Sequence, residues 1–277
     1  PMEVQGPGIL LDHLRQQGLD FHWIHPCAEG SAPIHASDYS GIVVLGSNHC
    51  ANEDLGWMQQ ERQLLDSALS SDVPVLGHCF GAQMLARAMG ARVWRNPCPH
   101  IGWSPVWVTR AAQQCLQLPP QPILFHWHYD TFGIPQGAQR SMYGPHCLNQ
   151  GFVHGRHWAF QGHLEVTEAS VRAWCQEGQD ELRHARGPGV QHAQQILALL
   201  PQHMAQLHAL ALRCYSAWTR QLSRPTQVDL PFASSRRVAP PPSPSILPTA
   251  PTHSTQALAY QATLATQTRA ILAHAGR

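Results

Sequence analysis

The residue with the clearest chemical meaning is a cysteine in a glycine-flanked turn. In Val73-Pro-Val-Leu-Gly-His-Cys-Phe-Gly-Ala-Gln83, an apolar strand-like run enters Gly77-x-Cys79-x-Gly81 and then a helix-like run. A sharp strand-to-helix turn needs small residues two positions on either side of a nucleophile, and it places that nucleophile at a helix N-terminus, where the dipole favours a thiolate. The same spacing also suits a buried structural cysteine, so a base is needed to decide.

A candidate base lies in Gln161-Gly-His163-Leu-Glu165, which follows the strand-like residues 157–160 and places a carboxylate two positions after an imidazole. In a cysteine-nucleophile mechanism the histidine takes the thiol proton and later protonates the leaving amine, while the carboxylate fixes its tautomer. A single histidine means little in a chain that has 19 of them. With the glycine-flanked cysteine, the segment predicts that Cys79, His163 and Glu165 act together.

Two further histidine patterns are weaker. His126-x-His128, with Asp130 nearby, places alternate side chains on one face of a predicted strand. These side chains could form a metal site, or the segment could need no metal. The sequence places no third ligand, so we expect no metal and no other cofactor. His78 is given no role, because its position next to Cys79 points it the other way along the turn.

Strands and helices are expected to alternate before and after the cysteine. Residues 8–17 have the pattern of an amphipathic helix, 19–24 that of a half-buried strand, and 41–46 that of a strand covered on both faces. A helix that starts near Asp54 and ends before Pro74 leads to the strand of the cysteine turn. This order predicts an α/β fold with a doubly wound, mostly parallel sheet flanked by helices.

The rest of the chain divides by composition. Residues 92–160 are predicted to be mostly β, and helices are predicted at 166–175 and 190–222, with Pro201 expected to kink or split the second. Eight prolines between Pro225 and Pro251 predict a disordered linker. The expected organisation is a domain over 1–224 whose first strand is missing, a Pro-rich disordered linker over 225–256 and a weakly helical tail over 257–277.

Composition narrows the classes of partner and enzyme. The chain has 18 basic and 17 acidic residues and a net charge of +1, so we expect binding to neither nucleic acid nor a membrane. All 18 basic residues are arginines, which excludes a Schiff-base lysine and a Walker-type phosphate loop. Eight irregularly spaced cysteines, no secretory signal and no apolar run near ~20 residues predict a cytoplasmic protein.

Over about residues 6–222 the sequence resembles the class I glutamine amidotransferases, most closely the stand-alone domains similar to the glutaminase half of guanosine monophosphate synthase. The glycine-flanked Cys79 turn and the His163-x-Glu165 segment, in this order, are the specific part of the resemblance. The supporting segments are Gly6-Pro-Gly8, Val43-Val-Leu-Gly46, Ile101-Gly-Trp-Ser-Pro105, His126-Trp-His-Tyr-Asp-Thr-Phe132, Asn149-Gln150 and Val166-Thr167. The family fold that this implies is flavodoxin-like.

The resemblance also implies an activity. Cys79 would attack the side-chain amide of glutamine or of a γ-glutamyl compound, with His163 as base and Glu165 as its orienting acid. Ammonia would leave, and the γ-glutamyl thioester would then be hydrolysed. The ammonia acceptor would be on a separate synthetase subunit, or the enzyme would simply hydrolyse γ-glutamyl amides.

The resemblance further implies binding residues around the nucleophile. The backbone N–H of Phe80 and the Gly46-Ser47 turn would form an oxyanion hole, and Gln83 would help to hold the substrate.

Some positions depart from the family pattern. Ser47 and Asn48 stand where a second Gly and a Pro are usual, Gly162 stands where Phe is usual, and Tyr129 where Gly is common. These departures keep open an alternative function, a non-catalytic binding or regulatory relative with a damaged site. The family sheet also begins with a strand just before Gly6, and without that strand the edge of an inner strand would be exposed.

Overall fold

The computed structural model describes residues 6–24, 35–222 and 270–275. The strands are β1 (Leu19–Ile24), β2 (Gly41–Val44), β3 (Val75–His78), β4 (Val93–Pro105), β5 (Trp107–Val108), β6 (Ile123–Phe132), β7 (Gln139–Tyr143), β8 (Gly151–His154), β9 (His157–Phe160) and β10 (Ala270–Ala275). The helices are α1 (Gly8–Gln16), α2 (Gly56–Ser70), α3 (Phe80–Ala88), α4 (Arg110–Leu116), α5 (Glu168–Glu177), α6 (Gln179–His184) and α7 (Ala193–Thr219), with a 3₁₀ turn, η1 (Ala36–Asp38).

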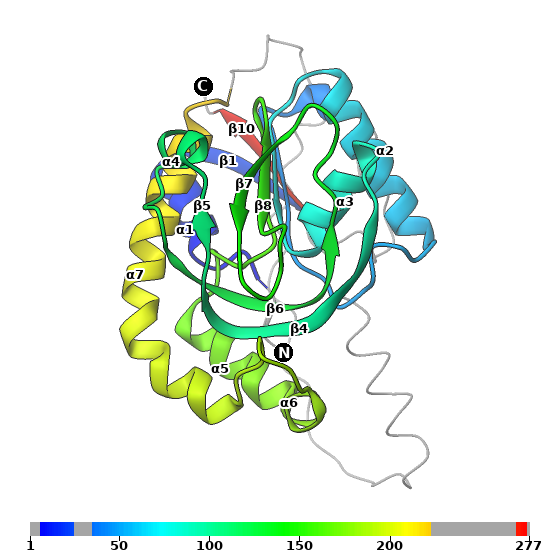
Figure 1. Cartoon of the computed structure of the whole chain (residues 1–277). Coiled ribbons are helices and arrows are strands. Elements are labelled where there is room, and N and C mark those ends of the chain that lie inside the picture. The colour runs from blue at the N-terminus through cyan, green and yellow to red at the C-terminus, as the bar shows by residue number, and fades with distance from the viewer. Residues whose placement is uncertain (1–5, 25–34, 223–269, 276–277) are drawn as a thin grey trace, which may run out of the picture.

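The main sheet has eight strands in the order β1-β10-β2-β3-β9-β8-β7-β5, and β4 and β6 form a separate antiparallel ribbon. Helices cover both faces of the sheet, with α1 and α7 on one side and α2 and α3 on the other (Figure 1). The predicted α/β class is therefore confirmed. The sheet is mixed rather than mostly parallel, because among the described strands only β2 with β3 and β3 with β9 pair in parallel.

Two hydrophobic cores lie on the two faces of the sheet. Along β2 and its C-terminal extension, Ile42 and Val44 belong to the core under α2 and α3, while Val43 and Leu45 belong to the core that includes α1 and α7. All four side chains are almost completely buried. A strand buried on both faces has no polar face to show, which is why this run is continuously apolar.

The position beside β2 is filled by β10, which corrects two expectations. β10 pairs antiparallel with β1 on one side and with β2 on the other, with Ala273 opposite Gly41 and Ala270 opposite Val44. The expected exposed edge of an inner strand is therefore absent from the described part of the sheet. Residues 270–275 form a strand and not the predicted helical tail. The predicted linker over 225–256 lies outside the described residues.

The helices agree with the patterns except at a few positions. Pro201 lies within α7, which runs unbroken from Ala193 to Thr219, so the predicted split does not occur. Short helices α4 and α6 are additional to the prediction. No helix in the described ranges is both long and apolar enough to cross a bilayer.

The topology brings three strand ends together. β2, β3 and β9 are adjacent and parallel, so their carboxyl ends lie at the same edge of the sheet. The β4–β6 ribbon curves across the molecule below this sheet (Figure 1). Open α/β sheets bind ligands outside the carboxyl ends of their strands, so this edge is the place to look for a site.

Candidate active site

The turn between β3 and α3 has the geometry of a nucleophile elbow. Cys79 has φ 50° and ψ −108°, a backbone conformation that non-glycine residues rarely adopt. A Cβ on Gly77 would lie 2.7 Å from the backbone nitrogen of Ala82, and one on Gly81 would lie 2.1 Å from the carbonyl oxygen of Val44. Only glycine fits at either position, as the spacing predicted, and the tight approach turns the cysteine out of the strand.

His163 and Glu165 follow β9, the strand next to β3. The His163 Nδ1 atom lies 2.6 Å from Glu165 Oε1, and both side chains are almost completely buried. The Cys79 sulfur lies close enough to the His163 ring to help raise its pKa. Since Nδ1 faces the carboxylate, Nε2 is the nitrogen left to act on the sulfur. The structure thus brings the three predicted residues together at one edge of the sheet.

Electrostatics favour the charged form of this pair. Burial alone would lower the pKa of His163, but the neighbouring Glu165 carboxylate and Cys79 sulfur outweigh it and raise that pKa to about 10. Burial would likewise raise the pKa of Glu165, yet the adjacent His163 and His78 rings lower it to about 2. An imidazole that holds a proton this firmly is suited to take one from a thiol.

Backbone contacts from the N-terminal segment fix the position of Glu165. The Ile9 N–H donates to the Glu165 carbonyl oxygen at 3.0 Å. A Cβ on Gly8 would lie 1.7 Å from the same oxygen, and Gly8 has φ +49°, so only glycine allows this approach. The Gly6-Pro-Gly8 segment, although far from Glu165 in sequence, therefore helps to fix the position of the Glu165 backbone.

His78 and Tyr215 are part of the site, although local sequence patterns assign them no role. His78 Nδ1 lies 3.4 Å from Glu165 Oε2, close enough for an electrostatic contact but without hydrogen-bond geometry. Its Nε2 lies 3.3 Å from the Tyr215 hydroxyl on α7. Burial lowers the pKa of His78, and the neighbouring Glu165 opposes that shift. Because α7 is far along the chain, no local signal could have revealed this contact.

The predicted oxyanion turn lies against the nucleophile and the base. A Cβ on Gly46 would lie 3.0 Å from His163 Cε1 and 3.8 Å from Cys79 Cβ. The Ser47 hydroxyl accepts a hydrogen bond from the His49 N–H at 3.2 Å, which holds the turn that follows β2. Phe80 is the first residue of α3, so its N–H has no acceptor within the helix.

All the predicted site residues line one cleft of about 540 Å³. Gln83, on the first turns of α3, donates to the Gln161 side chain at 3.3 Å and borders the same space. The residues that the sequence singled out are Gly46, Ser47, Cys79, Phe80, Gln83, His163 and Glu165, and the cleft is also bordered by the β6 residues 127–130 and by parts of α5 and α6. This volume is suited to a small molecule.

The structure shows the surroundings of two departures from the family pattern, Gly162 and Tyr129. The His163 ring packs edge-to-face against Trp174 on α5, with ring centroids 4.9 Å apart, so the base has an aromatic neighbour although residue 162 is glycine. Gly162 instead faces His126, whose Cε1 would lie 3.0 Å from a Cβ at that position. Tyr129 lies at the cleft with the Arg95 guanidinium 4.2 Å above its ring.

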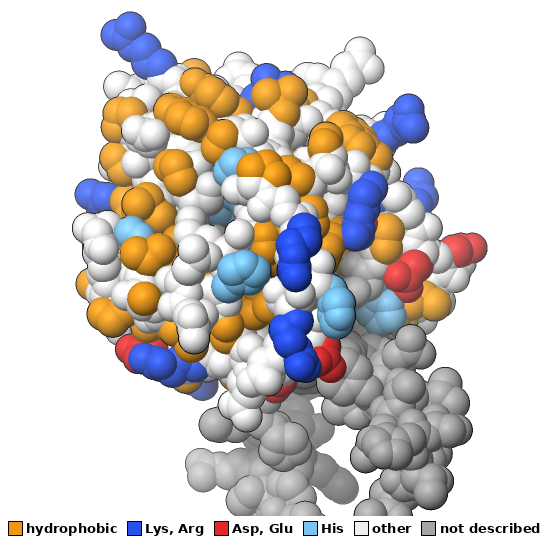
Figure 2. Space-filling view, turned by 60° about the horizontal axis from the view of Figure 1, so that its bottom comes forward, with side chains coloured by type: hydrophobic (Ala, Val, Ile, Leu, Met, Phe, Trp, Pro, Cys, Tyr) orange, Lys and Arg blue, Asp and Glu red, His pale blue; other side chains and the backbone are white. Residues whose placement is uncertain are grey.

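Arg, His and acidic side chains are interspersed with hydrophobic ones on the lower face of the molecule. Figure 2 shows this face, toward which the β4–β6 ribbon and α6 lie. The charges form small groups there and not one extended basic surface within the described part of the chain. This distribution matches the net charge of +1.

Several known proteins are similar to this chain. The family model for glutamine amidotransferase class-I matches residues 9–173. A glutamine amidotransferase structure from Methylobacillus flagellatus is 35% identical with a TM-score of 0.78, and the match covers 82% of this chain and 94% of that one. The glutamine amidotransferase-like protein YfeJ of Salmonella typhimurium is 27% identical over 66% of this chain and 80% of its own length.

A third relative points to the same family. One subunit of the glutamine-hydrolyzing GMP synthase of Thermoplasma acidophilum is 28% identical, over 55% of this chain and 75% of its own length. The family model spans more than half of the chain, and it includes the elbow and the His163-x-Glu165 segment. The chain therefore belongs to the class I glutamine amidotransferase family.

Proposed function

We propose that this protein hydrolyses the side-chain amide of glutamine, or of another γ-glutamyl compound, through a thioester on Cys79. The observation that carries the proposal is the placement of Cys79 beside the buried His163–Glu165 pair, at the carboxyl ends of adjacent strands. All three residues border the same cleft. A nucleophile, a base and an orienting acid in this order are what amide hydrolysis through a covalent intermediate requires.

The first half of the reaction forms the thioester. His163 takes the thiol proton, and the Cys79 sulfur attacks the γ-carbonyl carbon. The oxygen of the tetrahedral intermediate is stabilised by N–H groups of Phe80 and of the Gly46-Ser47 turn. The C–N bond then breaks, and the imidazolium gives its proton to the leaving nitrogen, so that ammonia departs and the γ-glutamyl group stays on sulfur.

The second half regenerates the enzyme. His163 removes a proton from a water molecule, and the resulting hydroxide attacks the thioester carbonyl. The C–S bond breaks and the sulfur takes back the proton from the imidazolium, which releases the carboxylic acid. Glu165 stays charged throughout and stabilises the imidazolium in both halves.

The fate of the ammonia is a further part of the proposal. The GMP synthase relative is named as a subunit of a glutamine-hydrolyzing synthase. By this likeness, a separate synthetase subunit would accept the ammonia released here. The other candidate is a non-catalytic binding or regulatory protein. It is disfavoured because His163 is paired with Glu165 in the cleft that Cys79 borders, and Trp174 packs against the base.

The test is covalent labelling with a glutamine analogue that has an electrophilic carbon in place of the γ-amide, followed by peptide mass spectrometry. We expect the label on Cys79 of the wild-type chain and none on Cys79→Ala. Cys50 is a suitable internal control, because it borders the same cleft but its thiol is hydrogen-bonded to the Asp130 carboxylate at 3.0 Å. Cys50→Ala should keep the label.

Hydrolysis should follow the same pattern. The assay measures ammonia release from glutamine and from a panel of γ-glutamyl amides, with and without a candidate synthetase. Cys79→Ala should abolish this release. Cys79→Ser should nearly abolish it, because a serine hydroxyl has no comparable ionised fraction at neutral pH. A wild-type chain that takes no label and releases no ammonia from any of these amides would support the non-catalytic alternative.

A further inference from the structure

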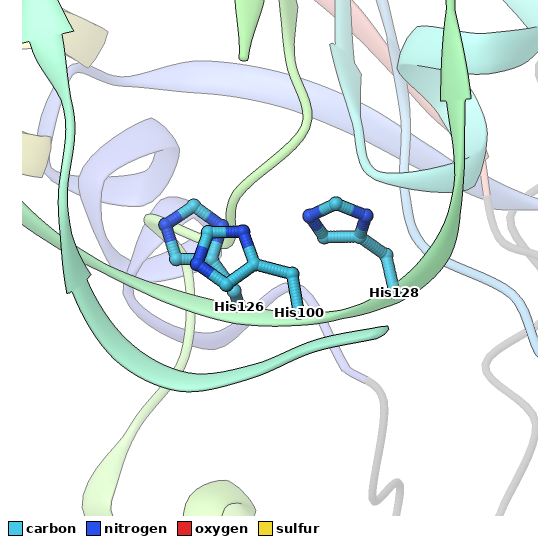
Figure 3. Close-up of side chains that lie close together, drawn as sticks. All are labelled: His100, His126 and His128. Carbon is cyan, nitrogen blue, oxygen red and sulfur yellow. The ribbon is translucent and has the colours of Figure 1, made fainter. Parts of the chain in front are cut away.

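Three histidines meet beneath the cleft, on the β4–β6 ribbon. His100 is on β4, and His126 and His128 are on β6. The antiparallel register places His100 opposite His128, and alternate residues of β6 share a face, so all three rings gather on one side of the ribbon (Figure 3). One ring nitrogen from each histidine lies within 4.8 Å of those of the other two.

These rings are buried and lack partners for several of their nitrogens. His100, His126 and His128 are at most 4% exposed. No described residue makes a hydrogen bond to His100 Nε2, to His128 Nε2 or to either nitrogen of His126. A buried polar atom without a partner costs free energy, and a cluster of such atoms that face one another needs a physical reason.

The hydrogen bonds that do exist leave the free nitrogens suited to bind a cation. His128 Nδ1 lies 2.9 Å from the Asp130 carbonyl oxygen, which can only accept, so the proton is on Nδ1 and Nε2 has a lone pair. Gln150 Nε2 lies 3.0 Å from His100 Nδ1 and donates to it, while Gln150 Oε1 has no partner among the described residues. Turning this amide over would pair Oε1 with an N–H at His100 Nδ1 and leave His100 Nε2 with a lone pair, so metal binding at His100 requires that turn.

The surroundings of the three rings also disfavour their protonation. Burial, reinforced by the neighbouring imidazoles, lowers the pKa of His100 to about 2 and that of His126 well below its usual range. Burial lowers the pKa of His128 to about 3. At neutral pH all three rings are therefore uncharged, and neutral imidazole is the form that binds a metal.

We propose that His100, His126 and His128 form a binding site for one divalent transition-metal ion of the zinc type. Three imidazoles without a carboxylate suit Zn²⁺, Co²⁺, Ni²⁺ or Cu²⁺ and do not suit Mg²⁺ or Ca²⁺, which prefer oxygen ligands. Three protein ligands leave one coordination position for water or another small ligand. This proposal replaces the expectation of no metal, which rested on the lack of a third ligand in the sequence.

Binding requires a small rotation of the rings. His100 and His126 are stacked, with centroids 3.9 Å apart and planes 10° from parallel, whereas a metal lies in the plane of each imidazole that binds it. One ring must therefore turn. Gly162 lies against the His126 ring, where a Cβ would be 3.0 Å from His126 Cε1, so a side chain at this position would hinder that rotation. His128 borders the catalytic cleft, so an ion can enter from that side.

The experiment is a titration of the full chain with Co²⁺, followed by its visible absorption bands, and with Zn²⁺, followed by calorimetry. The Cys79→Ala background is used so that the thiol cannot bind the ion together with His163. We expect one equivalent of each metal, and a melting temperature that rises with Zn²⁺. In His100→Gln and in His126→Gln, affinity should fall about tenfold or more and the Co²⁺ bands should change.

His184→Gln is the matched control, since His184 is an exposed histidine on α6 and the chain contains 19 histidines that could bind metal weakly. It should bind like the parent. Circular dichroism without metal shows which variants fold, and either of the two cluster variants suffices. The proposal is overturned if the parent binds no stoichiometric metal, or if a folded cluster variant binds it as tightly as the parent. Neither result depends on catalytic activity.

Discussion

Replacing Glu165 by Gln separates the charge of the orienting acid from its shape. The side chain keeps an oxygen that can accept from His163 Nδ1, now 2.6 Å from Glu165 Oε1, but it loses the negative charge. Glu165 is the largest influence that raises the pKa of His163 against burial. Without it, burial dominates and that pKa falls, so the imidazolium is no longer held at neutral pH.

The magnitude follows from the geometry. Two unit charges about 4 Å apart interact by about 4 kcal/mol at an effective dielectric constant of ~20. Since about 1.4 kcal/mol is a factor of ten in rate, losing this interaction corresponds to about 10³-fold. We expect kcat/KM for glutamine hydrolysis to fall between about 10²-fold and 10⁴-fold, which is less than the loss in Cys79→Ala.

The pH dependence gives an independent readout. In the wild-type chain the raised pKa of His163, about 10, keeps the imidazolium beside the sulfur from neutral pH up to that value. In Glu165→Gln the imidazolium is lost at lower pH, so the pH at which the rate of Cys79 labelling changes should move to a lower value than in the wild-type chain. The assay is the rate of labelling by a glutamine-analogue electrophile between about pH 5 and 10.

Glu168→Gln is the matched control, because it makes the same chemical change at an exposed site on α5, where Glu168 pairs with Arg172. Its rate and pH profile should equal those of the wild-type chain. If Glu165→Gln also kept the wild-type rate and profile while Cys79→Ala was inactive, the electrostatic role given to Glu165 would be refuted.

Two other perturbations test the fold. Deleting residues 270–277 leaves β1 and β2 without the strand between them. We therefore expect the melting temperature to fall by about 5–10 °C and light scattering to show association. Deleting residues 276–277 alone should change neither measurement. Buried Glu61 has no hydrogen-bond partner for either carboxylate oxygen among the described residues, and burial raises its pKa to about 8. The folded state therefore binds this proton more tightly than the unfolded state, and the free energy of unfolding should fall by about 1.4 kcal/mol per pH unit between its usual pKa and pH 8. Urea denaturation across this range should show that slope in the wild-type chain and not in Glu61→Gln, and an equal slope in both would contradict the argument.

The parts of the site that could be predicted are those set by neighbours in sequence. Gly77, Cys79 and Gly81 determine the elbow within five residues, and their close contacts follow directly from the turn. His163 and Glu165 are two positions apart, so their contact needs only one strand end. Both features can be predicted from sequence spacing, because the backbone fixes the relative directions of side chains that are only a few residues apart.

The parts that escaped prediction depend on pairing between distant segments. His100 joins His126 and His128 only through the register of β4 and β6, and that register shifts between Arg95 and His100. A shift of one residue would turn a side chain to the other face of the ribbon, so the sequence alone could not place the third histidine.

The position of residues 270–275 was equally out of reach of local patterns. The Ala- and Thr-rich sequence around these residues is marginal as a helix, and its local pattern does not indicate which strand it would pair with. The strand forms because an open position exists between β1 and β2, which is a property of the assembled sheet. Tertiary context therefore decided the secondary structure of this segment.

The place of β10 in the sheet also sets an order of events during synthesis. A chain leaves the ribosome from its N-terminus, so β1, β2, β3 and β9 emerge long before β10. Pairing of Ala273 with Gly41 joins residues more than 200 positions apart, the kind of contact that forms slowly because its loop must close first. Until then the backbone N–H and C=O groups at the edge of β2 are unpaired, two strands away from β9, which leads to His163. During this interval the nascent domain is most prone to associate with other chains through that edge.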